Sequence, residues 1–167
     1  MSLPVAALGA VVAALLELTI VPYLRFGGAQ PDLVLVLAIA WTIIVGIESG
    51  FVWAFLGGLL LDVLAPRPLG STAFVLLVCV GAAALLGRVL DPIRPAAPVI
   101  ATFLLAIVYA VLFLMVYGAL RTPIAVPDPL VAIIPRAVYD TALALLIGPT
   151  AIWFLARRRS RRERPDW

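Results

Sequence analysis

The chain has 167 residues, of which 65% are apolar and 13% are charged, with a formal net charge of +3 and a mean hydropathy of +1.19. A soluble domain carries about 45–50% apolar and about 25% charged residues, so this chain has too little polar surface to cover a water-soluble globule. Disorder requires the opposite composition, and one cysteine, Cys79, excludes a disulfide scaffold. The remaining class is a helical integral membrane protein.

The residue types also narrow the possible chemistry. The chain has no His and no Lys, and with one Cys it cannot build a soft-metal site or a Cys/His nucleophile pair. It contains no phosphate-binding loop, dinucleotide fingerprint, zinc-ligand spacing or nucleophile elbow. The sequence therefore predicts no enzyme, no metal and no cofactor. Half of the arginines lie in residues 157–164, which indicates membrane topology rather than nucleic-acid binding.

The first apolar run, residues 3–24, is long enough to span a bilayer and lacks the features of a cleavable signal peptide. Residues 33–65 are too long for one straight span and too short for two full ones. We expect two short helices, 33–47 and 50–65, joined by a glycine-rich turn at Gly46 to Gly50. Such helices must tilt little, thin the bilayer locally, or lie inside the bundle behind longer neighbours.

Three further spans follow at residues 71–90, 99–120 and 130–156, separated by proline-rich loops. The last of these is longer than the hydrocarbon core, so we expect it to tilt or to bend at Pro135 or Pro149. The expected fold is therefore all-α. It is a single polytopic bundle of six transmembrane helices over residues 1–156, followed by a basic tail at 157–167.

Six spans place both termini on one side of the membrane. The tail arginines, with Arg88 and Arg94, then lie on one face, against Arg25, Arg67 and Arg121 on the other. Positive residues favour the cytoplasm, so both termini are expected there. A single long helix over 33–65 would instead give five spans and an external N-terminus.

Ionisable residues within spans cost roughly 2.5–3.5 kcal/mol each, so each requires an explanation. Arg136 and Asp140 lie four residues apart on one expected helix, and we predict a buried ion pair between them. The alternative is a contact with a substrate or a partner. Glu17 is either a proton or ligand group, or a side chain reaching the interface near Arg25.

Asp62 lies at the wrong end of its helix for the helix dipole. It therefore needs donors, from Arg67 or from the amides that start the next helix, and would join the two helices. The alternative role is a transport site. Cys79 is expected to be a small buried hydrophobe. The tail would bind anionic lipid head groups or dock a cytoplasmic protein, through Arg157, Arg158, Arg159, Arg161, Arg162 and Arg164.

Three sequence elements resemble the rod-shape-determining MreD family. They are Pro31-Asp32 at the start of the second helix, the glycine-rich run from Gly50 that ends in Asp62, and the turn Pro68-Leu69-Gly70. The specific part covers about 40 residues, and the length and span number agree over the whole chain. By motif position, the family-typical or partner-contact candidates are Pro31, Asp32, Asp62, Pro68, Leu69 and Gly70.

The resemblance implies a non-enzymatic scaffold subunit of the bacterial cell-elongation complex, which makes peptidoglycan. Its partner would be MreC, and through MreC it would meet MreB, RodA and a class B penicillin-binding transpeptidase. It also implies a fold similar to the S components of energy-coupling-factor transporters. The alternative function is therefore a small-molecule-binding subunit of a transporter, which would have a polar cavity near the middle of the membrane.

Overall fold

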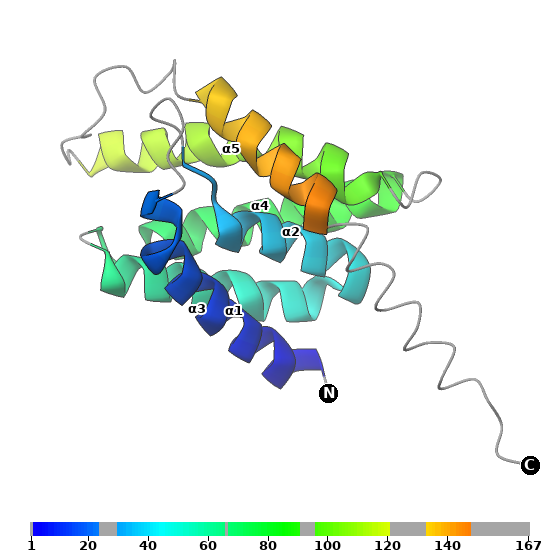
Figure 1. Ribbon diagram of the computed structural model, residues 1–167, viewed down its shortest axis with the longest axis horizontal. Coiled ribbons are helices and arrows are strands. Elements are labelled where there is room, and N and C mark those ends of the chain that lie inside the picture. Colours follow the sequence, from blue (N-terminus) through cyan, green and yellow to red (C-terminus); the bar gives the residue numbers. More distant parts are fainter. Residues whose placement is uncertain (1, 24–29, 66, 91–95, 121–132, 148–167) are drawn as a thin grey trace, which may run out of the picture.

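The computed structural model describes residues 2–23, 30–65, 67–90, 96–120 and 133–147. These ranges are helical throughout, apart from short turns (Figure 1). The labelled helices are α1 (Ser2–Thr19), the short 3-10 helix η1 (Val21–Tyr23), α2 (Leu33–Val45), α3 (Ile47–Leu64), α4 (Ser71–Val89) and α5 (Ala97–Ala119). A further helix, drawn in orange in Figure 1, covers residues 133–147. Each of the six predicted spans thus contains a helix, and the all-α prediction is confirmed.

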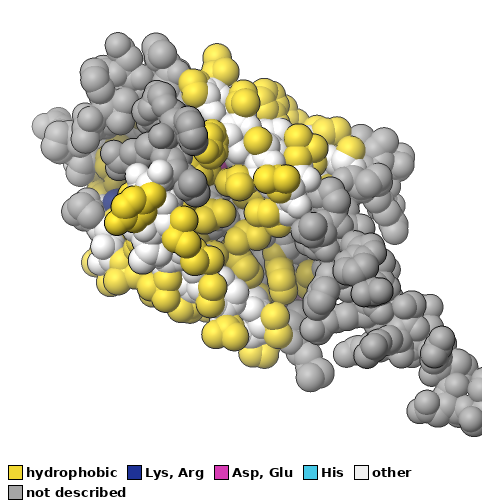
Figure 2. Space-filling view, viewed as in Figure 1, with side chains coloured by type: hydrophobic (Ala, Val, Ile, Leu, Met, Phe, Trp, Pro, Cys, Tyr) yellow, Lys and Arg dark blue, Asp and Glu magenta, His cyan; other side chains and the backbone are white. Residues whose placement is uncertain are grey.

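Four helical segments are long and apolar enough to cross a membrane, namely Leu3–Tyr23, Ile47–Leu64, Ser71–Val89 and Ala97–Ala119. Large apolar side chains are exposed along α1, α3, α4 and α5. Figure 2 shows hydrophobic side chains over most of the described surface on one face of the molecule. An apolar surface on apolar helices is the arrangement that lipid requires. The chain is a multi-pass membrane protein by this composition.

The short helix α2 lies at the centre of the bundle. It contacts α1, α3, α4 and α5, and seven of its 13 residues are buried. At 1.5 Å per residue it is about 20 Å long, which is less than a hydrocarbon core of about 30 Å. Of the three expected ways to accommodate a short helix, the structure therefore uses burial behind longer neighbours.

The corner between α2 and α3 is tighter than predicted. The expected turn covered Gly46 to Gly50, but only Gly46 leaves the helical conformation, with φ 132° and ψ 164°. This backbone region is accessible essentially to glycine alone. The carbonyl of Gly46 accepts hydrogen bonds from the Gly50 N–H and the Ser49 hydroxyl, both at 3.1 Å, so α3 can begin at once.

Small residues allow α3 and α4 to approach closely. A Cβ added to Gly58 would overlap the backbone of Ala73, and backbone cannot move aside as a flexible side chain does. Close backbone approach through small residues is the usual way in which membrane helices pack, because lipid supplies no hydrophobic drive between them. Cys79 on α4 is fully buried, as expected.

The first residues of α2 lie deeper inside the bundle than the C-terminal end of α3. Val34, its second residue, lies beside Gly57, seven residues before α3 ends. Those seven residues correspond to about 10 Å along the helix. At the other end, Ile43 lies beside Gly87, and each is two residues from its helix's end. Helix α2 therefore begins at a level more than one third of the way along α3, counted from the C-terminal end of α3.

Candidate functional site

Ionisable side chains from three helices gather around the start of α2. Asp32 directly precedes this helix, and its carboxylate binds the guanidinium of Arg136 from helix 133–147. Arg136 donates from Nε to Oδ2 at 2.6 Å and from Nη2 to Oδ1 at 2.5 Å. This two-point geometry is the strongest form of an arginine–carboxylate pair. Asp32 is buried, and one third of the Arg136 side chain is exposed.

Two further carboxylates cap the start of α2 from other helices. Asp140 accepts a hydrogen bond from the backbone N–H of Asp32 at 2.7 Å, and Glu17 of α1 accepts one from the N–H of Val34 at 2.8 Å. The first N–H groups of a helix have no partner within it and carry partial positive charge, so they favour carboxylates. We call Glu17, Asp32, Arg136 and Asp140 the α2-start cluster.

The α2-start cluster also contacts α5. The guanidinium of Arg136 lies over the ring of Tyr109, 5.9 Å from its centroid, in a cation–π arrangement. The second oxygen of Asp140, Oδ2, is buried and has no hydrogen-bond partner among the described residues. The cluster thus links α1, α2, α5 and helix 133–147 at one level of the bundle.

The pairing differs from the predicted one. We expected Arg136 to pair with Asp140, four residues along the same helix, but its ion pair in the described structure is with Asp32. The reason is that the Asp32 backbone N–H engages Asp140, while the Asp32 carboxylate faces Arg136 across the helices. An arginine that precedes an aspartate by four residues is also in the weaker order for pairing within a helix.

Glu17 also connects two helices, α1 and α2. Its side chain is buried, and its carboxylate is held by α2 rather than lying at an interface. Arg25, the predicted neighbour in the interfacial alternative, lies outside the described residues.

A second carboxylate cap joins α3 to α4. The carboxylate of Asp62 accepts the Thr72 N–H at 3.1 Å and the Ala73 N–H at 3.3 Å. The Ser71 hydroxyl lies 3.4 Å from the same carboxylate. These are the amides at the start of α4, which were one of the two predicted partners. Arg67, the other predicted partner, instead donates to the Thr72 hydroxyl at 3.4 Å and lies over the ring of Phe113.

The Pro68-Leu69-Gly70 motif forms the turn that makes this cap possible. The Ser71 N–H donates to the Pro68 carbonyl at 3.1 Å, and Gly70 has φ 85° and ψ −9°. These angles match the third position of a type II turn, where glycine is favoured. Gly70 and Pro68 therefore shape the backbone, whereas the Leu69 side chain is 74% exposed.

The remaining predicted site residues divide in two groups. Pro31 is buried beside Asp32 at the entry to α2. The tail arginines, from Arg157 to Arg164, lie outside the described residues, as do both ends of the predicted 130–156 span. Within the described ranges, no group of three or more His, Cys, Asp or Glu side chains forms a candidate metal site.

Sequence reasoning missed the Asp32–Arg136 pair. Both residues were noted separately, as a motif residue and as a charge within a span. The expected topology also places the start of the second helix and the start of the last helix at the same side of the membrane. The opposite charges of Asp32 and Arg136 on that side were the signal from which the pair could have been predicted.

The fold and its helix-capping carboxylates define a polytopic helical membrane protein whose buried charges connect helices. A family model described as rod shape-determining protein MreD matches residues 3–158. The chain therefore belongs to the MreD family, which functions in rod-shape determination and is not a known enzyme family. Neither the curated proteins nor the solved structures that were compared with the chain gave a match.

Proposed function

We propose that this chain is a non-enzymatic scaffold subunit of the cell-elongation complex in the bacterial inner membrane. In this proposal it binds a single-span MreC partner and, through it, meets MreB, RodA and the class B penicillin-binding transpeptidase. Membership of the MreD family supports the rod-shape role. The observation that carries the scaffold role is that the buried carboxylates of Glu17, Asp32 and Asp62 each bind a neighbouring helix.

A bundle fixed in this way is suited to holding partners. Buried ion pairs and caps contribute little net stability, but breaking one leaves an uncompensated charge, so they favour one arrangement of the helices over others. A partner's membrane helix would then meet a surface of constant shape. The family-typical Asp32 and Asp62 have the same role in this proposal, which is to fix the shape of the bundle.

Leu69 is the family-typical residue that we propose as a direct partner contact. Pro68 and Gly70 hold it in a hydrogen-bonded turn, and its apolar side chain is 74% exposed beyond the start of α4. An exposed apolar side chain on a rigid turn loses little conformational entropy when a partner covers it. By the predicted topology this turn faces the periplasm, where an MreC-type partner has its soluble part.

Co-purification tests the proposal. The tagged full-length chain, extracted in mild detergent from a rod-shaped bacterium, is expected to retain a single-span partner in stoichiometric amount. Leu69→Gln should lower that recovery at least fivefold, the effect of losing one important interface side chain. Leu120→Gln is the matched control, because Leu120 is also an exposed leucine just beyond a helix end.

The transporter alternative predicts a different result from the same preparation. A subunit of the S-component type would yield a bound small molecule in the denatured extract and no stoichiometric partner. The proposed scaffold would then be wrong. The proposed similarity to the S-component fold is a separate point, which an experimental structure of the full chain would test by superposition.

A further inference from the structure

One hollow lies at the opposite end of the bundle from Asp62, between the α2–α3 corner and the last turns of α4. Its volume is about 550 Å³. The lining residues are Thr42, Ile43, Gly46, Ile47, Ala84, Gly87 and Arg88. Three of these have no side chain or only a methyl group, which is why the space is not filled. Ligand sites commonly fall between about 300 and 1,000 Å³.

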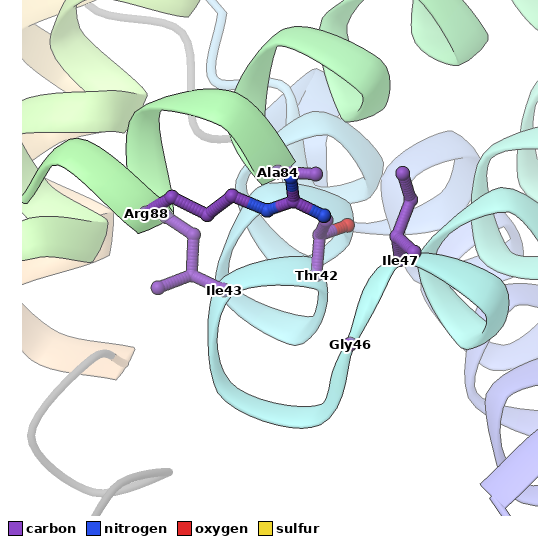
Figure 3. A pocket seen from close by; sticks show the side chains of 7 residues that line it. Thr42, Ile43, Gly46, Ile47, Ala84 and Arg88 are labelled. Carbon is purple, nitrogen blue, oxygen red and sulfur yellow. The ribbon is translucent and has the colours of Figure 1, made fainter. Parts of the chain in front are cut away.

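Arg88 supplies the charge of this hollow. It is exposed in the last turn of α4, and it is the single charged residue of the lining. Figure 3 shows its side chain lying along the hollow, with the guanidinium directed toward Thr42. No described acidic side chain forms a salt bridge with it. The guanidinium therefore has donors available for a ligand.

The start of α3 is a second group of the hollow that suits a phosphate. The Thr42 hydroxyl is not one, because it donates its single hydrogen to the Ala38 carbonyl at 2.6 Å and its oxygen is left as an acceptor. α3 begins beside Ile47 without a side-chain cap, so the first N–H groups of this helix are additional donors. Helix N-termini with free N–H groups favour anions such as phosphate.

The position of the hollow selects the source of the phosphate. Arg88 ends a 19-residue apolar helix that is long enough to span the membrane, so its guanidinium lies at the level of the lipid head groups. Ile43, Ile47 and Ala84 add apolar side chains to the lining of the hollow. A ligand with a phosphate head and an apolar body fits both parts.

We propose that this hollow binds the head group of an anionic phospholipid of the phosphatidylglycerol class, with Arg88 on the phosphodiester. Basic pockets between membrane helices are known as sites for anionic lipid head groups. The site is distinct from the arginines of residues 157–164, which lie outside the described residues and are expected to attract such lipids by their charge. It is also independent of the proposed binding of MreC.

Native mass spectrometry of the purified full-length chain tests the site. The protein is delivered from nanodiscs that contain phosphatidylcholine with a stated fraction of phosphatidylglycerol. The wild type is expected to retain one phosphatidylglycerol. Arg88→Gln should reduce its apparent affinity about fivefold, the effect of removing one basic group near a lipid surface. Ala84→Phe should reduce retention as well, because it fills the hollow without changing any charge.

Two controls separate this site from other causes. Gly81→Ala on the same helix adds a methyl group into open space and should retain the lipid as the wild type does. Replacing the six tail arginines by glutamine should leave the single retained lipid in place. Unaltered retention in both Arg88→Gln and Ala84→Phe would overturn the proposal, as would loss of the lipid with the tail arginines alone. Thermal unfolding of each variant shows whether a loss of lipid is only a loss of fold.

Discussion

At the scale of single residues, the buried carboxylates work as acceptors for helix N-termini. Glu17 and Asp140 bind the entry to α2, and Asp62 binds the entry to α4. In lipid, a backbone N–H without a partner costs several kcal/mol, and no water is present to replace it. Placing an acid of one helix on the amides of another satisfies both groups and fixes the contact between the two helices.

Two substitutions distinguish Asp32 from Asp140 as the partner of Arg136. Asp32→Asn should lower the free energy of unfolding by about 2–3 kcal/mol, because it leaves the Arg136 guanidinium without a counter-charge. Asp140→Asn should cost less than about 1 kcal/mol, since the amide oxygen still accepts the Asp32 N–H. Equilibrium unfolding in mixed micelles measures both values.

Glu48→Gln is the control for these variants, because Glu48 is an exposed carboxylate in the first turn of α3. It should change the stability by no more than a few tenths of a kcal/mol, as surface charges usually do. If Asp140→Asn were as damaging as Asp32→Asn, the originally expected pairing within helix 133–147 would be the correct one.

Local physics explains which of these contacts could be predicted. For Asp62 the sequence predicts donors from Arg67 or from the amides of the following helix, because a carboxylate at a helix C-terminus needs donors, and the amides that bind it follow within eleven residues. The partner of Arg136 is 104 residues away in the chain. Which helices are neighbours depends on packing over the whole bundle, and the hydropathy of a single chain does not encode it.

At the scale of helices, the sequence pattern placed the elements well and their junctions less well. The predicted glycine-rich turn covered five residues, yet one glycine suffices, and Glu48 to Gly50 belong to α3. The surplus glycine has another use. Gly50 lies against the Thr42 hydroxyl, so it allows α3 to pass α2 directly beyond the corner. Composition alone does not distinguish a turn glycine from a packing glycine.

Close packing of α3 on α4 gives the prediction for this scale. Gly58→Ala should destabilise the protein by about 1–3 kcal/mol, because the added methyl group meets the backbone of Ala73. Gly81→Ala is the matched control in α4, where a methyl group meets no atom within 4 Å. The same unfolding measurement checks both. Equal stability of the two variants would show that the α3–α4 contact is looser than the structure has it.

At the scale of the whole molecule, the short central helix α2 begins inside the bundle rather than at its end. α2 ends level with α4 at one side, but its start lies about 10 Å below the end of α3 at the other. The two residues before α2, Pro31 and Asp32, are therefore non-helical backbone inside the bundle. Such backbone is tolerated within a membrane only where protein or a water-filled cavity surrounds it, and Pro31 and Asp32 are both buried.

The chain reverses at Gly46, and this reversal bears on the predicted number of membrane crossings. α2 and α3 pack against each other on either side of this single residue, so they are two helices and not one long helix. With a helix in each of the six predicted spans, we predict six crossings, which is an even number. We then predict that both termini lie on the same side, and the arginine distribution favours the cytoplasm as that side.

Reporter fusions test this topology in growing cells. A reporter placed after Trp167 should be active only in its cytoplasmic form, and so should one placed after Leu90. A reporter after Gly70 should be active in its periplasmic form, because the Pro68-Leu69-Gly70 turn lies at the opposite end of α4 from Arg88. A periplasmic signal after Trp167 would contradict the predicted cytoplasmic location of the C-terminus. A cytoplasmic signal after Gly70 would move Leu69 to the wrong side for a periplasmic partner and would also move the Arg88 hollow to the outer leaflet.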